Sequence, residues 1–215
     1  MMDWQVNILK TFEDYRFGRL FKIIRAELQH RLFDGRMSEP VTRINFERGD
    51  SVAVLLYDEQ RDSVILVRQF RYPVYASLSS EERQADASRA WLLEIVAGVR
   101  DKGVNAQEVA HKELLEEAGY KVHGELERIS TIYASPGGTS ERITIFLGHV
   151  DFERPAAAGG GVVAEGEDIQ VVVLPLEKAM QMIETGEIRD AKTIVALQHL
   201  VLRKSVGSGA VQKTA

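Results

Sequence analysis

Three glutamates at helical spacing, in the segment KELLEEAG, are the residues of this chain best suited to do chemistry. Glu113, Glu116 and Glu117 stand at i, i+3 and i+4, which places them on one side of a helix. Like charges at this spacing repel, at a cost of roughly 0.2–0.5 kcal/mol for each pair. Carboxylate oxygens are the ligands that Mg²⁺ prefers. The cluster therefore indicates either a solvated face, on which Lys112 pairs with Glu108 and Glu116, or a site for a hard cation.

The ends of this helix can be predicted from its capping residues. Asn105 is a favourable N-cap, Glu108 can complete a capping box, and Val104 and Val109 occupy the positions of a hydrophobic staple. Gly119 ends the helix as a C′ glycine. An apolar stripe for packing on a sheet is formed by Ala106, Ala110, Leu114 and Ala118. We expect the buried stripe to lie beside the acidic one.

Strands are predicted on both sides of this helix. Residues 24–32 alternate between apolar and polar, Asp34 and Gly35 form a turn, and residues 41–49 return, so this part is a hairpin. The apolar runs SVAVLLY and SVILVRQF predict buried strands of a central sheet. Two further strands flank the Pro-Gly-Gly turn at 136–138.

The last third of the chain predicts a loop, a strand and two helices. The loop ends in three glycines at 159–161, and the helices are expected at 176–185 and from Asp190 to about Arg203. The polar segment 77–90 predicts an exposed loop or short helix prone to disorder. These elements predict an α/β (α+β) fold with three parts, namely an N-terminal β region at 1–50, a main domain at 51–204 and a disordered tail at 205–215.

Composition restricts the classes of partner. The 215 residues, 45% hydrophobic and 27% charged, are typical of one globular domain with appendages. A net charge of −5 disfavours a nucleic-acid polymer, but a small phosphorylated ligand remains possible where arginines and a metal ion gather. The chain has no cysteine, no long apolar run and a polar start. We therefore expect no disulfide, no membrane partner and a cytoplasmic location.

The frame around the acidic helix resembles the Nudix hydrolase box, in which a glycine and a loop precede a helix of the form Arg-Glu-x-x-x-Glu-Glu-x-Gly. Gly98 and the segment KELLEEAGY match it in register. The sequence departs from it at Val104, where the family has a glutamate, and at Lys112, where it has an arginine. Those two family residues form an ion pair, which the cap and the staple replace here.

The resemblance covers about residues 15–204 and is strongest to the nucleoside-diphosphate-sugar branch, including ADP-ribose pyrophosphatases. It rests on the segments FDGRMSEPVTRINFERG, WLLEIVAG, SPGGTSER and EGEDI. The segment TGEIRDAKT is equally similar to GDP-mannose pyrophosphatases. The resemblance implies a Nudix α/β/α sandwich with a mixed central sheet, a Nudix domain over 51–204 and an N-terminal antiparallel hairpin region that dimerises.

Metal and base residues are carried over from this resemblance. It implies that Glu113, Glu117, Glu167 and the carbonyl of Ala97 bind Mg²⁺, with Mn²⁺ as the alternative ion, and that Glu116 is a further ligand or a hydrogen-bond acceptor beside the ion. Glu165, in a glycine-containing loop that can close over substrate, matches the family's catalytic base. His111 is the rival base, although a surface histidine is the ordinary interpretation of that position.

Substrate-binding residues are implied in the same way. Arg71, Glu94 and Gly98 match positions that face the substrate, and Glu141 matches a contact to the terminal sugar. Arg43 matches an arginine that reaches the base from the partner subunit. Leu20, followed by Phe21, stands where relatives place an aromatic that stacks on the base, which leaves the identity of the base open.

The implied activity is Mg²⁺-dependent hydrolysis of a nucleoside diphosphate sugar by a homodimer. ADP-ribose, split into AMP and ribose 5-phosphate, is the first expectation. GDP-mannose or another nucleotide sugar is an alternative substrate. A degenerate domain that binds a nucleotide without cleaving it is the alternative that Val104 and Lys112 motivate.

Overall fold

The computed structural model describes residues 4–211 and divides into two compact units. The first unit contains Met1–Asp50 and Tyr133–Arg142, and the second contains Ser51–Ile132 and Ile143–Ala215. The sequence did not indicate that the segment 133–142 belongs to the first unit.

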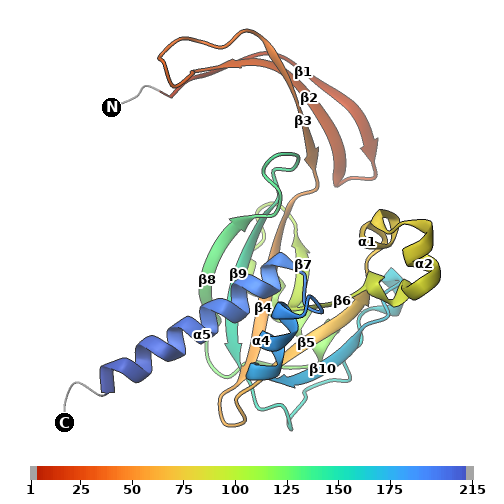
Figure 1. Ribbon diagram of the computed structural model, residues 1–215, viewed down its shortest axis with the longest axis vertical. Helices are drawn as coiled ribbons and strands as arrows, with labels where there is room; N and C mark the ends of the chain where they lie inside the picture. Colours follow the sequence, from red (N-terminus) through yellow and green to blue (C-terminus); the bar gives the residue numbers. More distant parts are fainter. Residues whose placement is uncertain (1–3, 212–215) are drawn as a thin grey trace. The chain divides into compact units, whose positions relative to one another are not determined.

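The first unit is built on a three-stranded antiparallel sheet in the order β1-β2-β3 (Figure 1). Its strands are β1 (Val6–Phe17), β2 (Phe21–His30) and β3 (Val41–Glu47). The predicted hairpin is confirmed, because β2 pairs with β3 across the turn that contains Asp34 and Gly35. The segment 133–142 joins this sheet, since Phe46 N donates to the carbonyl of Gly138 at 2.8 Å.

The second unit contains a mixed sheet in the order β10-β5-β4-β9-β8. Strand β4 pairs parallel with β9 and antiparallel with β5, as the predicted mixed sheet requires. Two short strands join at its side, β6 to β5 and β7 to β4. The strands are β4 (Asp50–Asp58), β5 (Ser63–Phe70), β6 (Trp91–Glu94), β7 (Val96–Arg100), β8 (Glu127–Tyr133), β9 (Arg142–His149) and β10 (Gln170–Pro175).

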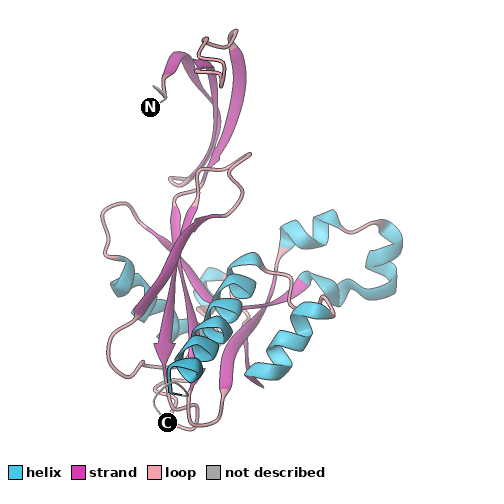
Figure 2. Cartoon of the chain, turned by 60° about the vertical axis from the view of Figure 1, so that its left-hand side comes forward, coloured by secondary structure: helices cyan, strands magenta, loops and turns pink. Residues whose placement is uncertain are grey.

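Helices cover both faces of this sheet, which confirms the predicted α/β/α sandwich (Figure 2). On one face, α3 (Ala106–Glu113) and the turn that follows it pack Ala110, Leu114 and Ala118 against Val54 and Val67. On the other face, α4 (Leu176–Glu184) and α5 (Ala191–Val211) cover the side chains that alternate with these. The alternation of side chains along β4 and β5 supplies both apolar surfaces, because successive residues of a strand point to opposite faces.

Local signals in the sequence account for where most of these helices begin. Asn105 caps α3 by accepting a hydrogen bond from Gln107 N at 2.8 Å, as its position predicts. Asp190 caps α5 through Thr193 N at 3.0 Å. The segment 77–90 is helical rather than disordered, and Ser79 and Glu82 form a capping box at its start. Its elements are the end of α1 (Tyr72–Ser77), α2 (Ser80–Asp86) and a 3-10 turn (Ala87–Ala90).

The C-terminal helix is longer than the sequence predicts. It continues past Arg203 to Val211, so residues 205–211 are helical where we expected a disordered tail. The last four positions of that tail, 212–215, lie outside the described residues. Within residues 4–211, no helix is both long enough and apolar enough to span a membrane.

Candidate active site

The helix that carries the acidic residues changes from an α-helix to a π-helix after Glu113. The π turn spans Leu114–Ala118 and ends at Gly119, whose φ of +79° is left-handed and whose N–H donates to the carbonyl of Leu114. The predicted C′ glycine is therefore confirmed, but the α-helical spacing assumed for all three glutamates is wrong from Leu114 onward. Single π turns of this kind are uncommon and occur frequently at functional sites.

Glu117 is the most deeply buried carboxylate of the π turn, with 3% of its surface exposed. One of its oxygens accepts the Ala97 N–H at 3.2 Å. Burial raises the pKa of Glu117 to about 8, and the charges of Glu113 and Glu167 contribute to the increase while Arg71 opposes it. The protein thus holds a carboxylate whose negative charge its surroundings do not balance.

Glu113 approaches the backbone of β7 closely enough to require a glycine there. A Cβ atom on Gly98 would overlap the carboxyl group of Glu113. Burial raises the pKa of Glu113; Lys112 opposes this, and the charges of Glu116, Glu167 and Glu165 add to it. Gly98 is therefore needed for space, because any side chain would displace the carboxylate.

The glycine-rich loop is tied to the π turn by backbone hydrogen bonds. Gly160 N donates to the carbonyl of Glu117 at 2.8 Å, and Gly161 N donates to the carbonyl of Glu116 at 2.9 Å. Both glycines have positive φ, and a Cβ on Gly161 would collide with the side chain of Glu167. These glycines therefore serve tight turns and close packing here.

This anchored loop brings Glu165 and Glu167 to the acidic helix. Glu167 accepts the N–H of Val162 at 2.8 Å, and its charge acts on both Glu113 and Glu117. Glu165 ends an exposed 3-10 turn, and its charge also acts on Glu113. The structure therefore brings together the carboxylates that the sequence singled out in two segments about fifty residues apart.

A cation fits the chemistry of this cluster. Among residues 4–211, no group of three or more acidic or histidine side chains is arranged to hold a metal ion. Lys112 pairs with Glu116 at 2.7 Å, as expected for a solvated face, while Glu117 and Glu167 accept backbone amides. Burial, and after it the neighbouring carboxylates, nevertheless raise the pKa of Glu113 and of Glu117, and an oxygen-seeking divalent cation would stabilise the charged form of both.

A buried ion-pair network lies beside the cluster. Arg71 donates two hydrogen bonds to Glu94, at 2.7 and 2.8 Å, and Lys192 Nζ lies 2.5 Å from the same carboxylate and 3.0 Å from Asp190. Burial tends to raise the pKa of Glu94, but Arg71 and Lys192 hold that pKa below its usual range. The sequence analysis did not single out Lys192, although it stands in TGEIRDAKT two positions after the helix cap at Asp190.

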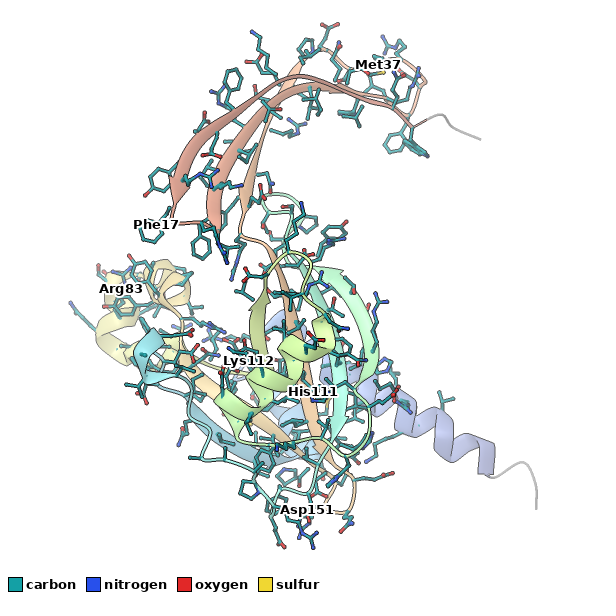
Figure 3. All side chains as sticks on the ribbon, turned by 180° about the vertical axis from the view of Figure 1, so that it is seen from behind. Phe17, Met37, Arg83, His111, Lys112 and Asp151 are labelled. Atoms are coloured by element: carbon teal, nitrogen blue, oxygen red, sulfur yellow. The ribbon has the colours of Figure 1, made fainter. Side chains whose placement is uncertain are left out.

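The remaining candidate residues belong to the first unit or to the exposed side of α3. Arg43 is exposed on β3, where its Nη1 donates to the Thr42 carbonyl, and buried Glu141 lies 3.5 Å from Arg48. Both belong to the first unit, as do Leu20 and Phe21, and Phe21 stacks on Phe46. His111, the rival base, is exposed on α3 next to Lys112 (Figure 3).

The sequence from residue 47 to residue 197 matches the family model of the NUDIX domain. This match spans more than half of the chain, so the chain belongs to the Nudix hydrolase family, as the box predicts. It is 40% identical to the ADP-ribose pyrophosphatase of Escherichia coli (strain K12) over 182 residues, which are 85% of this chain and 82% of that one.

Two further comparisons support the same placement. The chain is 40% identical to the GDP-mannose pyrophosphatase of Citrobacter koseri over 155 residues, which are 72% of this chain and 75% of that protein. The crystal structure of an ADP compounds hydrolase aligns with 95% of this chain and 96% of its own, with a TM-score of 0.68. That alignment has 20% sequence identity and shows the fold alone.

We predict that removing the charge of Glu117 changes how the metal-free protein responds to pH. The folded state binds this proton more tightly than the unfolded state, so its stabilising contribution is complete below the unfolded pKa of 4.5 and is lost as pH rises toward about 8. Between about pH 5 and about pH 8, the wild type should lose about 1–3 kcal/mol of unfolding free energy relative to Glu117→Gln. Urea unfolding in the presence of a chelator measures this difference.

Glu108→Gln is the matched control, because Glu108 is exposed in the first turn of the same helix. Its pH profile should follow that of the wild type. Parallel profiles for the wild type and Glu117→Gln would contradict the prediction, since they would mean that folding does not alter the proton affinity of Glu117.

Proposed function

We propose that this chain uses Mg²⁺ to hydrolyse the diphosphate bond of a nucleoside diphosphate sugar, with ADP-ribose giving AMP and ribose 5-phosphate. The observation that carries this proposal is the carboxylate cluster around buried Glu117 in a Nudix domain, in which Glu113 lies against Gly98. The negative charge of the cluster favours binding of a cation, and a bound cation would in turn attract the negatively charged diphosphate. The 40% identity to an ADP-ribose pyrophosphatase supports the choice of substrate.

The proposed roles of the metal-binding residues come from the family resemblance. Glu113, Glu117, Glu167 and the carbonyl of Ala97 would hold the ion, and Glu116 would leave Lys112 to join them or would accept a hydrogen bond from bound water. A cation there neutralises phosphate charge and makes a bound water more acidic. Mn²⁺, which also accepts carboxylate and carbonyl oxygens, could replace Mg²⁺.

Glu165 is the residue we propose as general base. It is exposed at the end of its 3-10 turn, beyond the point where Gly160 and Gly161 anchor the loop. It would take the proton from the attacking water as the water oxygen bonds to phosphorus. The bond from phosphorus to the bridging oxygen then breaks, and that oxygen leaves with the second phosphate.

Arg71 supplies positive charge for the diphosphate. Its guanidinium is held in place by Glu94, which Lys192 holds in turn, and its charge reaches Glu117. A planar guanidinium with fixed donors is well suited to bind phosphate oxygens. By the resemblance, Gly98 and Glu94 face the substrate as well, and Glu141 contacts the terminal sugar.

A screen of nucleotide sugars tests this proposal. ADP-ribose and GDP-mannose should be offered with and without Mg²⁺, and we expect turnover of ADP-ribose that stops when the metal is chelated. Faster turnover of GDP-mannose would favour the alternative indicated by TGEIRDAKT and by the GDP-mannose pyrophosphatase relatives. Tight binding without product would favour a degenerate domain, and restoring the family pair with Val104→Glu and Lys112→Arg would then be expected to create activity.

Glu165→Gln should separate the base from the metal ligands. The substitution keeps the size of the side chain but removes the proton acceptor, so kcat should fall by about 10²–10⁴-fold with little change in KM. Asp168→Asn, which removes a charge from an exposed residue of the same loop, is the matched control. A kcat near that of the wild type in Glu165→Gln would mean that another group is the base.

Glu117→Gln should instead raise the Mg²⁺ concentration needed for activity.

We further propose that the chain acts as a homodimer. No residue of β1 or β2 is buried, and exposed apolar side chains of β1 include Val6, Ile8, Tyr15 and Phe17. A three-stranded sheet without a covering layer is marginal by itself, and a second copy of the chain would cover it. By the resemblance, Arg43 would then complete the site of the partner subunit.

Mixing two inactive variants tests whether sites are shared. Arg43→Ala and Glu113→Gln each disable one part of the site, and a mixed dimer contains one site that retains both residues. Activity should therefore rise above the sum of the separate variants when the two are unfolded and refolded together. No recovery, together with monomers in analytical ultracentrifugation at micromolar concentration, would contradict the proposal.

A further inference from the structure

An arginine-lined pocket lies in the second unit, away from the carboxylate cluster. It has a volume of about 360 Å³ and is formed by β5, β6, the 3-10 turn at 87–90 and the connection between α4 and α5. Its charged and aromatic lining residues are Arg68, Arg89, Arg189, Glu187 and Trp91. None of these residues has a role in the proposed hydrolysis.

The pocket and the carboxylates belong to opposite faces of the sheet. Leu66 and Leu93 pack in the core beneath α4 and α5, whereas Val67 packs in the core beneath α3. Arg68 follows Val67 along β5, so it lies on the same face as Leu66. A ligand in this pocket would therefore not compete for the space beside Glu113 and Glu117.

The arginines of the pocket carry more positive charge than the protein neutralises. Arg89 pairs with Glu82 at 2.8 Å, and Arg189 donates to the carbonyl of Arg89 at 2.8 Å. In the part of the chain that the structure describes, neither Arg68 nor Arg189 lies within ion-pairing distance of a carboxylate. The buried Nε of Arg68 also has no acceptor among these residues. A buried donor without an acceptor is unfavourable, and an incoming anion would relieve the excess charge.

The lining of this pocket contributes little negative charge. Glu187 is its one carboxylate among the lining residues, and it already accepts a hydrogen bond from Thr185 Oγ1 at 3.0 Å. Trp91 adds a half-exposed aromatic surface, held by its contact with Phe70 at a centroid distance of 4.9 Å. Guanidinium groups next to an aromatic ring form a surface suited to a phosphate attached to an organic group.

We propose that this pocket binds the phosphate group of a small molecule, with Arg68 and Arg189 as the anion-binding residues and Trp91 beside them. The phosphate could be free inorganic phosphate or the phosphate of a nucleoside monophosphate. The binding is independent of divalent metal, because the lining provides guanidinium donors. It is also independent of the proposed hydrolysis, because it uses the other face of the sheet.

Trp91 provides a direct signal for binding. The chain has two tryptophans, Trp4 and Trp91, so Trp4→Phe leaves Trp91 as the single fluorescent indole. Inorganic phosphate and adenosine 5′-monophosphate should each be titrated into this variant in the presence of a chelator, which prevents metal-dependent binding at the carboxylates. We expect a saturable change in Trp91 fluorescence with at least one of the two probes.

Charge-removing variants decide whether the arginines cause that change. Arg68→Gln and Arg189→Gln in the Trp4→Phe background should each weaken binding by about tenfold or more, because a charge-assisted hydrogen bond is lost. Arg128→Gln removes the same charge from an exposed position on β8 and should leave the affinity unchanged. Circular dichroism confirms that each variant is folded.

The two probes distinguish the source of the phosphate. Equal affinity for both would identify the phosphate alone as the recognised group, and tighter binding of the nucleotide would show that Trp91 contributes. No saturable change with either probe would overturn the proposal. Binding that Arg68→Gln and Arg189→Gln leave intact would overturn it as well.

Discussion

The arrangement of the site depends on two backbone hydrogen bonds, from the amides of Gly160 and Gly161 to the carbonyls of Glu117 and Glu116. They join a glycine loop to the π turn, and so join the segment that carries Glu165 and Glu167 to the helix that carries Glu113 and Glu117. A regular α-helix uses its interior carbonyls for its own hydrogen bonds, whereas its last carbonyls are available to other donors. The loop takes these carbonyls because three glycines let it adopt the left-handed conformations that the approach requires.

Two buried glutamates of this unit have pKa values that are shifted in opposite directions. Glu94 lies between Arg71 and Lys192, and its pKa is held below the usual range although it is almost fully buried. Glu117 is equally buried but faces other carboxylates, and its pKa is raised to about 8. Burial favours the neutral form of either group, so the neighbours decide which one stays ionised. The carboxylate of Glu94 orients Arg71, while the carboxylate of Glu117 is the one that we propose as a ligand of a cation.

Part of the site could be predicted because it is encoded locally. The cap at Asn105, the C′ glycine at Gly119 and the alternation along β4 and β5 depend on residues a few positions apart, and the structure confirms them. The family box located the glutamates for the same reason. The π turn was not predicted, and its carbonyls at Glu116 and Glu117 bond to a loop that lies far along the chain.

The sequence by itself determined which residues carry charge, where the helices begin and which faces are apolar, since these properties follow from residue types and from periods of 2 and 3.6 residues. Only the tertiary structure decided which charges meet. Lys192 reaches Glu94 across 98 positions of sequence, and Arg68 shares a pocket with Arg189. Whether a carboxylate is compensated, as Glu94 is, or left with excess charge, as Glu117 is, depends on desolvation and on distant neighbours, which no local pattern records.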